Sequence, residues 1–304
     1  MAKGIDLSII ILNYNTWELL GDCLRSISKT KKGRYMIETI VVDNASQDKS
    51  PEMVEKEFGW VKLIRSKTNL GFAAGNNLAV PHALGRYLLF LNSDTVLPDQ
   101  IFPEIIDFLD RNKKVGALTV RLVLRSGEMD PDCHRGFPTP WASLTYFVGM
   151  EKLFPQSRLF GRYHQFYLPQ DEIHEIDCGC GAFLMVRKEV IQQVGSWDED
   201  YFFYGEDIDF CFRIKKGNWQ IVYYPQAEVI HYKGASSGLR TETSDITKAD
   251  RPTRLKAAKA SSEAMKIFYN KFYRKQYPRI LTSIIIFGIQ VKGWFRFLLN
   301  YFKS

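Results

Sequence analysis

The sequence lacks the glycine-rich motifs that mark many nucleotide-binding enzymes. No G-x-G-x-x-G follows its first apolar segment, which argues against a dinucleotide-dependent dehydrogenase, and it contains no P-loop. Cysteine is scarce: the five cysteines in 304 residues are odd in number and scattered, which favours a reducing cytosol over a disulfide framework. Cys178 and Cys180 have no second Cys or His pair at zinc-finger spacing, so we assign them a structural role.

Net charge is absent from most of the chain. The formal charge of +7 resides in residues 262–304, where eight Lys or Arg accompany one acidic residue. The first 261 residues balance at 33 basic and 33 acidic. A nucleic-acid-binding protein is expected to spread basic residues over its folded surface. We therefore expect no nucleic-acid partner.

Apolar segments alternate with segments of helical periodicity in the first third of the chain. Four of them have the composition of strands: residues 7–15, 38–46, 61–66 and 86–94. This alternation predicts an α/β fold with a parallel sheet and right-handed crossovers. After about Gly116 the pattern changes to a strand and hairpin, an irregular aromatic-rich stretch, and then strand, helix, loop, helix and strand.

Polar residues follow the predicted strands of this first part. They are Asn13, Tyr14, Asn15, Asp43, Asn44, Asn69, Asn92, Ser93 and Asp94. The carboxyl ends of parallel strands meet at one edge of a sheet, where open α/β sheets bind their ligands. An isolated Asn-Ser-Asp is more often a capped turn. Four such clusters in succession predict one shared crevice.

Two later features have both a functional and a structural interpretation. Glu206, Asp207 and Asp209 lie beside aromatic residues at the start of a helical pattern, where acids also favour the helix dipole. His231 ends an apolar run, where a lone histidine is more often a core residue.

Six segments, taken in order, resemble glycosyltransferase family 2. They are "IIILNYN", "VVDNAS", "TNLGFAAGNN", "LNSDT", "GAFLMVRKEVIQQVG" and "YGEDIDFCFRIKKGNWQIVYYPQAEVIHYKG". The resemblance covers about residues 6–238 and is strongest to bacterial rhamnosyltransferases of cell-surface polysaccharide synthesis. It implies a GT-A fold with a Rossmann-like, mostly parallel central sheet flanked by helices. It also implies a nucleotide-sugar donor, a divalent cation and inversion at the anomeric carbon.

The resemblance also predicts how the chain is divided. Residues 1–238 would form the catalytic domain, with a nucleotide-sugar half at about 1–115 and an acceptor half at about 116–238. The polar stretch 239–261 would be a mobile loop. Residues 262–304 would form basic amphipathic helices.

The donor-binding residues follow from the same resemblance. Asp43 matches the acid that accepts hydrogen bonds from a pyrimidine base, and Tyr14 lies where the family frames the nucleotide. Gly71 would permit close backbone approach to the donor. The full predicted set is Asn13, Tyr14, Asn15, Asp43, Asn69, Gly71, Asn76, Asn92, Ser93 and Asp94.

The resemblance places the metal on Asp94 and His231. Asp94 matches the metal-binding acid of the family's DxD motif, and His231 matches a second ligand in relatives. Mn²⁺ or Mg²⁺ would neutralise the leaving diphosphate there. Asn92 stands where many relatives have a first acid, so metal affinity would depend on Asp94 and His231.

The predicted chemistry lies in the Glu-Asp pair. Asp207 matches the base that takes the proton of the acceptor hydroxyl. Glu206 would orient donor or acceptor, or would itself be the base if the register of the loop differs. Trp197 and Asp198 match a pair that flanks the acceptor, and Arg240 is added for its charge and its position in the loop.

The C-terminal segment predicts where in the cell the protein is found. Twelve uncharged residues between Arg279 and Lys292 are too few to span a bilayer. The apolar face that follows, bordered by basic residues, is typical of an interfacial amphipathic helix. We therefore expect a cytoplasmic protein, peripheral on the inner face of the cell membrane. The alternative is a helix packed on the domain or on a second subunit, as in a homodimer.

The sequence thus favours an inverting transferase that moves L-rhamnose from dTDP-L-rhamnose to a glycan or lipid-linked acceptor. UDP-hexoses such as UDP-galactose or UDP-GlcNAc are the alternative donors. A non-catalytic sugar-nucleotide-binding protein is the alternative of another class, and the retained Asp94, Asp207 and His231 argue against it. Nucleotidyltransferase or phosphatase chemistry would need more acids for two metals.

Overall fold

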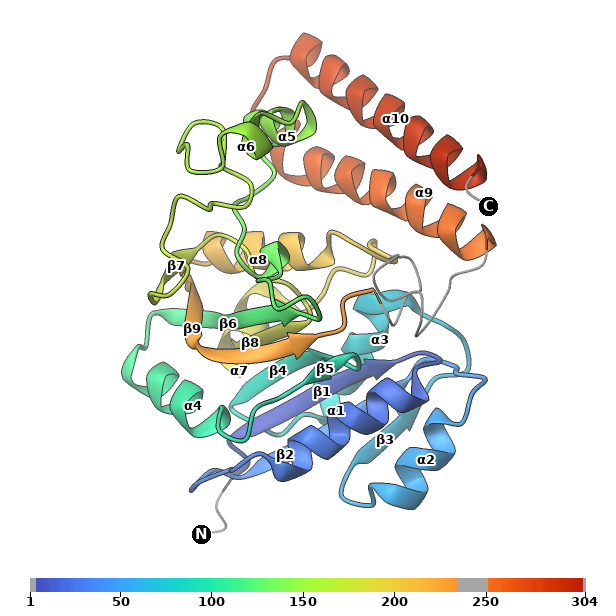
Figure 1. Cartoon of the computed structure of the whole chain (residues 1–304), viewed down its shortest axis with the longest axis vertical. Coiled ribbons are helices and arrows are strands. Elements are labelled where there is room, and N and C mark those ends of the chain that lie inside the picture. Colours follow the sequence, from blue (N-terminus) through green and yellow to red (C-terminus); the bar gives the residue numbers. More distant parts are fainter. Residues whose placement is uncertain (1–3, 235–250, 303–304) are drawn as a thin grey trace.

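The structure is a computed structural model that describes residues 4–234 and 251–302. Within these residues the centre is a nine-stranded mixed sheet in the order β3-β2-β1-β4-β8-β6-β9-β5, with β7 paired to β9 (Figure 1). The strands are β1 (Leu7–Asn13), β2 (Ile37–Asp43), β3 (Lys62–Arg65), β4 (Tyr87–Asn92), β5 (Thr95–Val96), β6 (Val115–Leu124), β7 (His174–Ile176), β8 (Phe183–Arg187) and β9 (Gln220–His231).

Ten α-helices are found among the same residues. They are α1 (Trp17–Lys29), α2 (Ser50–Glu57), α3 (Gly71–Ala79), α4 (Phe102–Arg111), α5 (Pro140–Phe147), α6 (Met150–Leu153), α7 (Lys188–Val194), α8 (Glu206–Lys216), α9 (Arg251–Phe268) and α10 (Arg279–Phe302). Short 3₁₀ turns occur at η1 (Val80–His82) and η2 (Pro131–Cys133), and a π-helical turn at η4 (Tyr269–Tyr273).

The first half of the sheet is parallel, as the alternation of strands and helices predicts. β1 pairs in parallel with β2 and β4, and β2 pairs in parallel with β3. Helices α1 and α2 lie on the face turned toward the viewer in Figure 1, and α3 packs on β1 and β2. The central strands are therefore buried on both faces, which accounts for their unbroken runs of Ile, Val and Leu.

Beyond β4 the sheet is mixed. Strand β8 is antiparallel to both β4 and β6, whereas β9 is parallel to β6. A parallel pairing needs a crossover connection, usually a helix lying on the sheet. The long irregular stretch before β7 and β8 allows the chain to enter the sheet from its other end. The parallel arrangement therefore holds for β3-β2-β1-β4 and is interrupted by β8.

Helices α9 and α10 form an antiparallel pair that lies apart from the sheet in Figure 1. Phe268, Tyr269, Tyr273 and Ile289 form a small core between them, and Phe212 of α8 packs against it. The pair begins at the start of α9, earlier than the predicted boundary at residue 262, because Ala, Lys and Leu are strong helix formers in its first turns. The predicted Arg240 lies outside the described residues.

Candidate active site

The carboxyl ends of β1, β2 and β4 share a buried polar network. Asn13 Nδ2 donates to Asp43 Oδ1 (3.3 Å), and Thr16 Oγ1 donates to Asn13 Oδ1 (2.6 Å). The Thr16 hydroxyl also lies 3.0 Å from the hydroxyl of Ser93. All four side chains are buried. The network ties three strand ends into one rigid edge, and Ser93 belongs to it rather than to a ligand surface.

An open cleft of about 510 Å³ borders Asp43 between the ends of β2 and β3. Asp43 Oδ2 accepts the backbone N–H of Ser46 (3.1 Å). Asn15 has a left-handed backbone (φ 54°), and its Oδ1 accepts the N–H of Gln47 (2.7 Å). Tyr14 is 41% exposed at the same edge. The carboxylate and peptide groups at this cleft have the chemistry that a planar base with imide and carbonyl groups would need, and the Tyr14 ring is exposed nearby in the chain.

A second loop, after β3, is held close to the sheet by two amides. Asn44 Nδ2 donates to Asn69 Oδ1 (3.1 Å), and Asn69 Oδ1 accepts the N–H of Gly71 (2.9 Å). Gly71 has φ +80°, and a Cβ there would lie 2.4 Å from the carbonyl oxygen of Phe202. Only glycine fits this position. Asn44 is one of the polar residues expected at this edge, but the family resemblance assigned it no role in donor binding.

The metal corner, defined as Asp94 and His231, lies where β4 passes into β5. Strand β5 pairs with the end of β9, which brings His231 Nε2 to 3.5 Å from Asp94 Oδ1. On the other side of the ring, Asp130 Oδ2 lies 3.0 Å from His231 Nδ1. Burial alone would lower the pKa of His231, but the carboxylates of Asp94 and Asp130 outweigh it and raise the pKa to about 9.

The donor atoms of this corner fit a divalent cation. A carboxylate oxygen suits Mg²⁺ or Mn²⁺, and an imidazole nitrogen suits Mn²⁺ once a bound cation has displaced its proton. Asp130 on the far ring nitrogen is the carboxylate that commonly orients a metal-binding histidine. Among the described residues no group of three or more His, Cys, Asp or Glu has the geometry to hold a metal ion. Asp94 and His231 are the two candidate ligands that the fold brings together at this corner.

Asp207 lies in the first turn of α8 and is paired with a buried arginine. Its Oδ2 accepts a hydrogen bond from Arg135 Nη2 at 2.5 Å, and its Oδ1 accepts the N–H of Ile208 at 2.8 Å. Arg135 also donates to the carbonyl oxygen of Gly179 (2.8 Å). Both oxygens of the carboxylate are therefore oriented, and each keeps capacity to accept one more proton donor.

Glu206 has a different environment from its neighbour. It is 7% exposed, and its Oε2 has no hydrogen-bond partner among the described residues. Burial, with the charge of Asp207 in addition, raises the pKa of Glu206 to about 8. Two adjacent acids thus have distinct roles available at neutral pH: Glu206 keeps a proton that it can donate, while Asp207 faces a cation.

Some predicted residues lie away from any ligand surface. Trp197 is 3% exposed and packs against Phe72, Phe90 and Phe210, so its ring belongs to the core and does not flank an acceptor. Asn76 is buried, and its amide donates to the carbonyl of Phe72 within α3. Burial of a large aromatic residue and of a helix amide explains both positions without a ligand.

Asp198 and Asn92 also have structural partners. Asp198 forms an ion pair with Lys271, whose Nζ lies 2.6 Å from Asp209 Oδ2. This pairing joins the loop before α8 to the π-helical turn after α9. Asn92 ends β4, and its carbonyl oxygen accepts the hydroxyl of Thr95 (2.8 Å). No partner of the Asn92 side chain is defined within the described residues.

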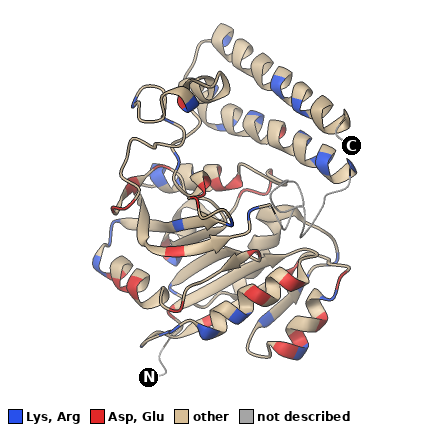
Figure 2. Cartoon of the chain, viewed as in Figure 1, with Lys and Arg blue, Asp and Glu red and all other residues tan. Residues whose placement is uncertain are grey.

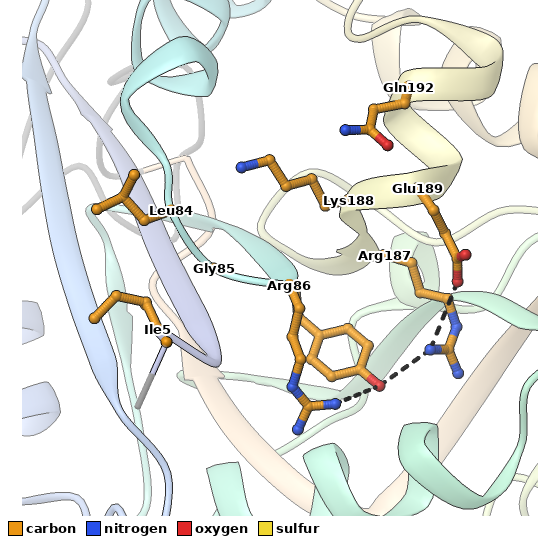
Figure 3. Close-up of a pocket in the computed structure, with 10 residues that line it drawn as sticks. Ile5, Leu84, Gly85, Arg86, Arg187, Lys188, Glu189 and Gln192 are labelled. Carbon is orange, nitrogen blue, oxygen red and sulfur yellow. Dashed lines mark hydrogen bonds and ion pairs between the residues drawn. The ribbon is translucent and has the colours of Figure 1, made fainter. Parts of the chain in front are cut away.

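Another cleft, of about 460 Å³, lies at the opposite edge of the sheet, where β4 begins (Figure 3). Its cations are already engaged. Arg187 donates to the carbonyl oxygens of Val115 (2.6 Å) and Leu109 (2.5 Å), and Lys188 donates to that of Ala83 (2.8 Å). Because these groups already have protein acceptors, they are poorly placed to bind an anion in this cleft.

The sequence patterns did not reveal the segment from Asp130 to Arg135. It falls in the irregular stretch after β6, yet Asp130, Asp132 and Arg135 connect the metal corner to Asp207. Lys233 Nζ lies 2.5 Å from Asp130 Oδ1 and also contacts Asp132. The signal available was the density of charge in "DPDCHR" beside an aromatic-rich stretch, where buried pairs need partners.

Comparison with known proteins identifies the family. The family model described as Glycosyl transferase family 2 matches residues 8–195. The chain belongs to this family. This family 2 glycosyltransferase is 26% identical to an N-acetylglucosaminyl-diphospho-decaprenol L-rhamnosyltransferase of Mycobacterium tuberculosis, over 76% of this chain and 78% of the relative. It is 27% identical to the low-salt glycan biosynthesis hexosyltransferase Agl10 of Haloferax volcanii, over 95% of this chain and 83% of the relative.

Solved structures confirm the fold of this glycosyltransferase. GalNAc-T7 with UDP, GalNAc and Mn²⁺ superimposes with a TM-score of 0.58 at 15% identity, covering 88% of this chain and 50% of that chain. S. aureus TarS in complex with UDP-GlcNAc gives 0.56 at 15% identity, covering 95% and 73%. The predicted GT-A fold and transferase class are therefore confirmed.

Proposed function

We propose that this enzyme is an inverting, metal-dependent glycosyltransferase that moves L-rhamnose from dTDP-L-rhamnose to a hydroxyl of a glycan or lipid-linked acceptor in cell-surface polysaccharide synthesis. The observation that carries the proposal is the continuous series of contacts along the carboxyl edge. It runs from Asp43 at the base cleft to Ser93, past the metal corner, and through the segment from Asp130 to Arg135 to Asp207. The choice of rhamnose draws on the similarity to the mycobacterial rhamnosyltransferase and to rhamnosyltransferase WbbL of Escherichia coli, which is 26% identical over 53% of this chain and 61% of the relative.

The chain's own residues divide the reaction between them. Asp43 accepts the imide N–H of the pyrimidine base, and the glycine at position 71 lets the backbone approach the donor. A divalent cation, when bound at Asp94 and His231, supplies positive charge against the diphosphate. Asp207 takes the proton of the acceptor hydroxyl as that oxygen attacks the anomeric carbon from the face opposite the diphosphate. The bond between the anomeric carbon and the diphosphate breaks, and the configuration inverts.

Glu206 acts beside this base as a neutral acid. With a pKa of about 8 it keeps its proton at neutral pH and can donate a hydrogen bond to a sugar hydroxyl. A second ionised carboxylate beside Asp207 would repel the first. The asymmetry of the pair therefore supports Asp207 as the base.

UDP-hexoses are the second class of donor. The similarity to the hexosyltransferase Agl10, and the fold shared with TarS in complex with UDP-GlcNAc, favour them. Uracil and thymine offer the same imide donor to Asp43, so that residue does not distinguish them. The sugar, and not the base contact, decides between the two classes.

A donor panel tests the proposal. The purified enzyme with Mn²⁺ should form a glycosidic bond from dTDP-L-rhamnose and not from UDP-galactose or UDP-GlcNAc, with product detected by mass spectrometry. Asp94→Asn should abolish transfer and also the Mn²⁺-dependent rise in melting temperature in the presence of dTDP. Asp99→Asn, an exposed acid five residues further along, is the matched control and should behave as wild type.

Two outcomes would contradict the proposal in different ways. Transfer from a UDP-hexose alone would favour the alternative donor class. Nucleotide binding without any glycosidic bond, across donors and acceptors, would favour a non-catalytic sugar-nucleotide-binding protein.

We further propose that helix α10 binds an anionic membrane surface, where a lipid-linked acceptor would be found. This helix of 24 residues packs on α9, has one buried residue, and is long and apolar enough to cross a membrane by length and composition. Its most exposed side chains include Ile284, Phe287, Trp294 and Leu299. Figure 2 shows Lys and Arg on both helices of the pair.

Binding of α10 to the membrane surface accounts for its packing on α9 better than a membrane-spanning position does. Arg296 Nη1 donates to Ser261 Oγ of α9 (2.7 Å), so α10 lies along a helix that carries several cations. Moving α10 into the hydrocarbon would strip these cations of water, which is costly. Lys292 lies over the ring of Phe147 in α5 (5.1 Å), which extends the apolar face to that helix. The combination of apolar and basic groups is complementary to anionic lipid.

A further inference from the structure

The segment from Asp130 to Arg135 joins the metal corner to the acid at the start of α8. Asp130 contacts the His231 ring and Lys233, and Lys233 contacts Asp132. Asp132 Oδ1 lies 3.8 Å from Arg135 Nη1, and Arg135 Nη2 lies 2.5 Å from Asp207 Oδ2. Apart from the local Asp132–Arg135 pair, these contacts join residues 72 to 103 positions apart, so they exist only in the folded protein.

We propose that Arg135 is a positioning residue for the transfer reaction: its guanidinium fixes the rotamer and the ionised form of the Asp207 carboxylate, in register with the metal corner. The inference rests on the proposed function, in which Asp207 is the base. Nothing in the family comparison assigns Arg135 this role.

The geometry of Arg135 suits it to positioning rather than to binding substrate. It is 5% exposed, so it does not reach into the cleft. Its Nη2 donates to both Asp207 and the carbonyl oxygen of Gly179. These two contacts orient the guanidinium toward α8. A planar guanidinium holds a carboxylate in one orientation, which a lysine ammonium does less well.

The charged and titratable groups around Asp207 show why a cation matters there. Glu206 adjoins it on α8, and Cys178, Tyr163 and Asp132 lie close enough to interact electrostatically with it or with Arg135. Apart from Arg135, these neighbours are acidic or neutral. Without the guanidinium, the Asp207 carboxylate would lose the positive charge that faces it and its fixed rotamer.

A purely structural role is the alternative. The backbone of Arg135 forms a bridge with that of Cys178, through N–H to carbonyl bonds of 3.0 and 2.9 Å, and a buried arginine holds its surroundings together. Such a role would affect stability without affecting the pH dependence of turnover. The pH profile therefore separates the two interpretations.

The experiment compares Arg135→Gln and Arg135→Lys with Arg187→Gln in the full chain. Arg187 is the matched control, because it is an equally buried arginine bound to backbone carbonyls at the far edge of the sheet (Figure 3). We expect Arg135→Gln to lower kcat by about 10- to 100-fold and to move the acidic limb of kcat/KM by about one pH unit upward. The Kd for dTDP with Mn²⁺, measured by calorimetry, should stay within about twofold of wild type.

Arg135→Lys keeps the charge and should restore the wild-type position of the acidic limb while recovering only part of kcat. Arg187→Gln should lower the melting temperature and leave the pH profile unchanged. If Arg135→Gln does not fold, the kcat of Arg135→Lys decides: a wild-type kcat would overturn the inference, and a lowered kcat with an unchanged Kd for dTDP would support it. An unshifted limb in Arg135→Gln, or a limb in Arg135→Lys displaced from wild type, would overturn the inference. Absence of transfer by the wild-type enzyme would instead refute the proposed function.

Discussion

At the scale of single residues, Glu206 and Asp207 show how one helix turn can hold two unlike acids. Both begin α8, yet Asp207 is bound by Arg135, and Glu206 is buried without a partner for its Oε2 among the described residues. The physical difference is the direction in which each side chain leaves the helix. Adjacent helical residues point about 100° apart, so Asp207 meets a guanidinium and Glu206 does not.

Glu206 predicts a pH dependence of stability. Its pKa in the folded protein is about 8, above the ordinary value of 4.5. The folded state therefore binds more protons than the unfolded state between these values, and stability should fall as pH rises through that window. Glu206→Gln removes the titration. We expect the melting temperature of Glu206→Gln to exceed that of wild type by several degrees at pH 8.5 and by less at pH 5. Each kcal/mol gained in the free energy of unfolding corresponds to about 2–4 °C.

Calorimetric melting across pH 5–9 is the measurement. Glu57→Gln, at an exposed position at the end of α2, is the control and should follow wild type at every pH. A Glu206→Gln curve parallel to that of wild type would show that Glu206 does not retain its proton.

At the scale of elements, the loop between β3 and α3 is shaped by contacts with a distant loop. The N–H of Phe72 donates to the carbonyl oxygen of Phe202 (3.0 Å), at the point where Gly71 passes close to the same group. Strand and helix periodicity predicted β3 and α3 on either side. It could not predict Phe202, because that contact joins residues more than a hundred positions apart.

Gly71→Ala should therefore destabilise the protein and weaken donor binding together. A Cβ at this residue would lie 2.4 Å from a backbone oxygen, and the positive φ adds strain. We expect a loss of about 1–3 kcal/mol in the free energy of unfolding, measured by urea denaturation. Gly59→Ala is the control, because a Cβ there meets nothing within 4 Å. Equal, small effects of the two substitutions would contradict the packing described for Gly71.

At the scale of the whole molecule, apolar surface and positive charge coincide in the C-terminal helix pair. Helix α8 and the loop before it are joined to these helices by Lys271, which pairs with Asp198 and Asp209. Phe212 of α8 adds an apolar contact with the same region. A membrane-bound helix pair would thus hold α8, and with it Asp207, at a defined height above the lipid.

Substitutions on the exposed face of α10 test the membrane proposal. The double variant Phe287→Glu and Trp294→Glu should lower binding to phosphatidylglycerol vesicles by about 10-fold or more, because it removes two apolar side chains and adds negative charge. Vesicle sedimentation is the measurement, with phosphatidylcholine vesicles as the neutral comparison. The double variant Trp60→Glu and Leu84→Glu, at exposed apolar positions outside the helix pair, should bind as wild type.

Unchanged vesicle binding by the α10 variant would refute the proposal that α10 binds a membrane surface. Light scattering gives the other outcome. If the wild-type protein is a dimer that does not bind vesicles, and the α10 variant is a monomer, the exposed face of α10 contacts a second subunit.

The sequence by itself determined the parallel half of the sheet and the polar residues at its carboxyl edge. Unbroken apolar strands and short helical segments are local patterns, and parallel pairing then brings Asn13, Asp43 and Asn92 to one side. Only the tertiary structure decided the rest of the site. It buried Trp197 in the core, and it placed Asp130 and Arg135 between His231 and Asp207. These contacts join residues 72 and 101 positions apart, and no local periodicity encodes which distant partner a buried charge will find.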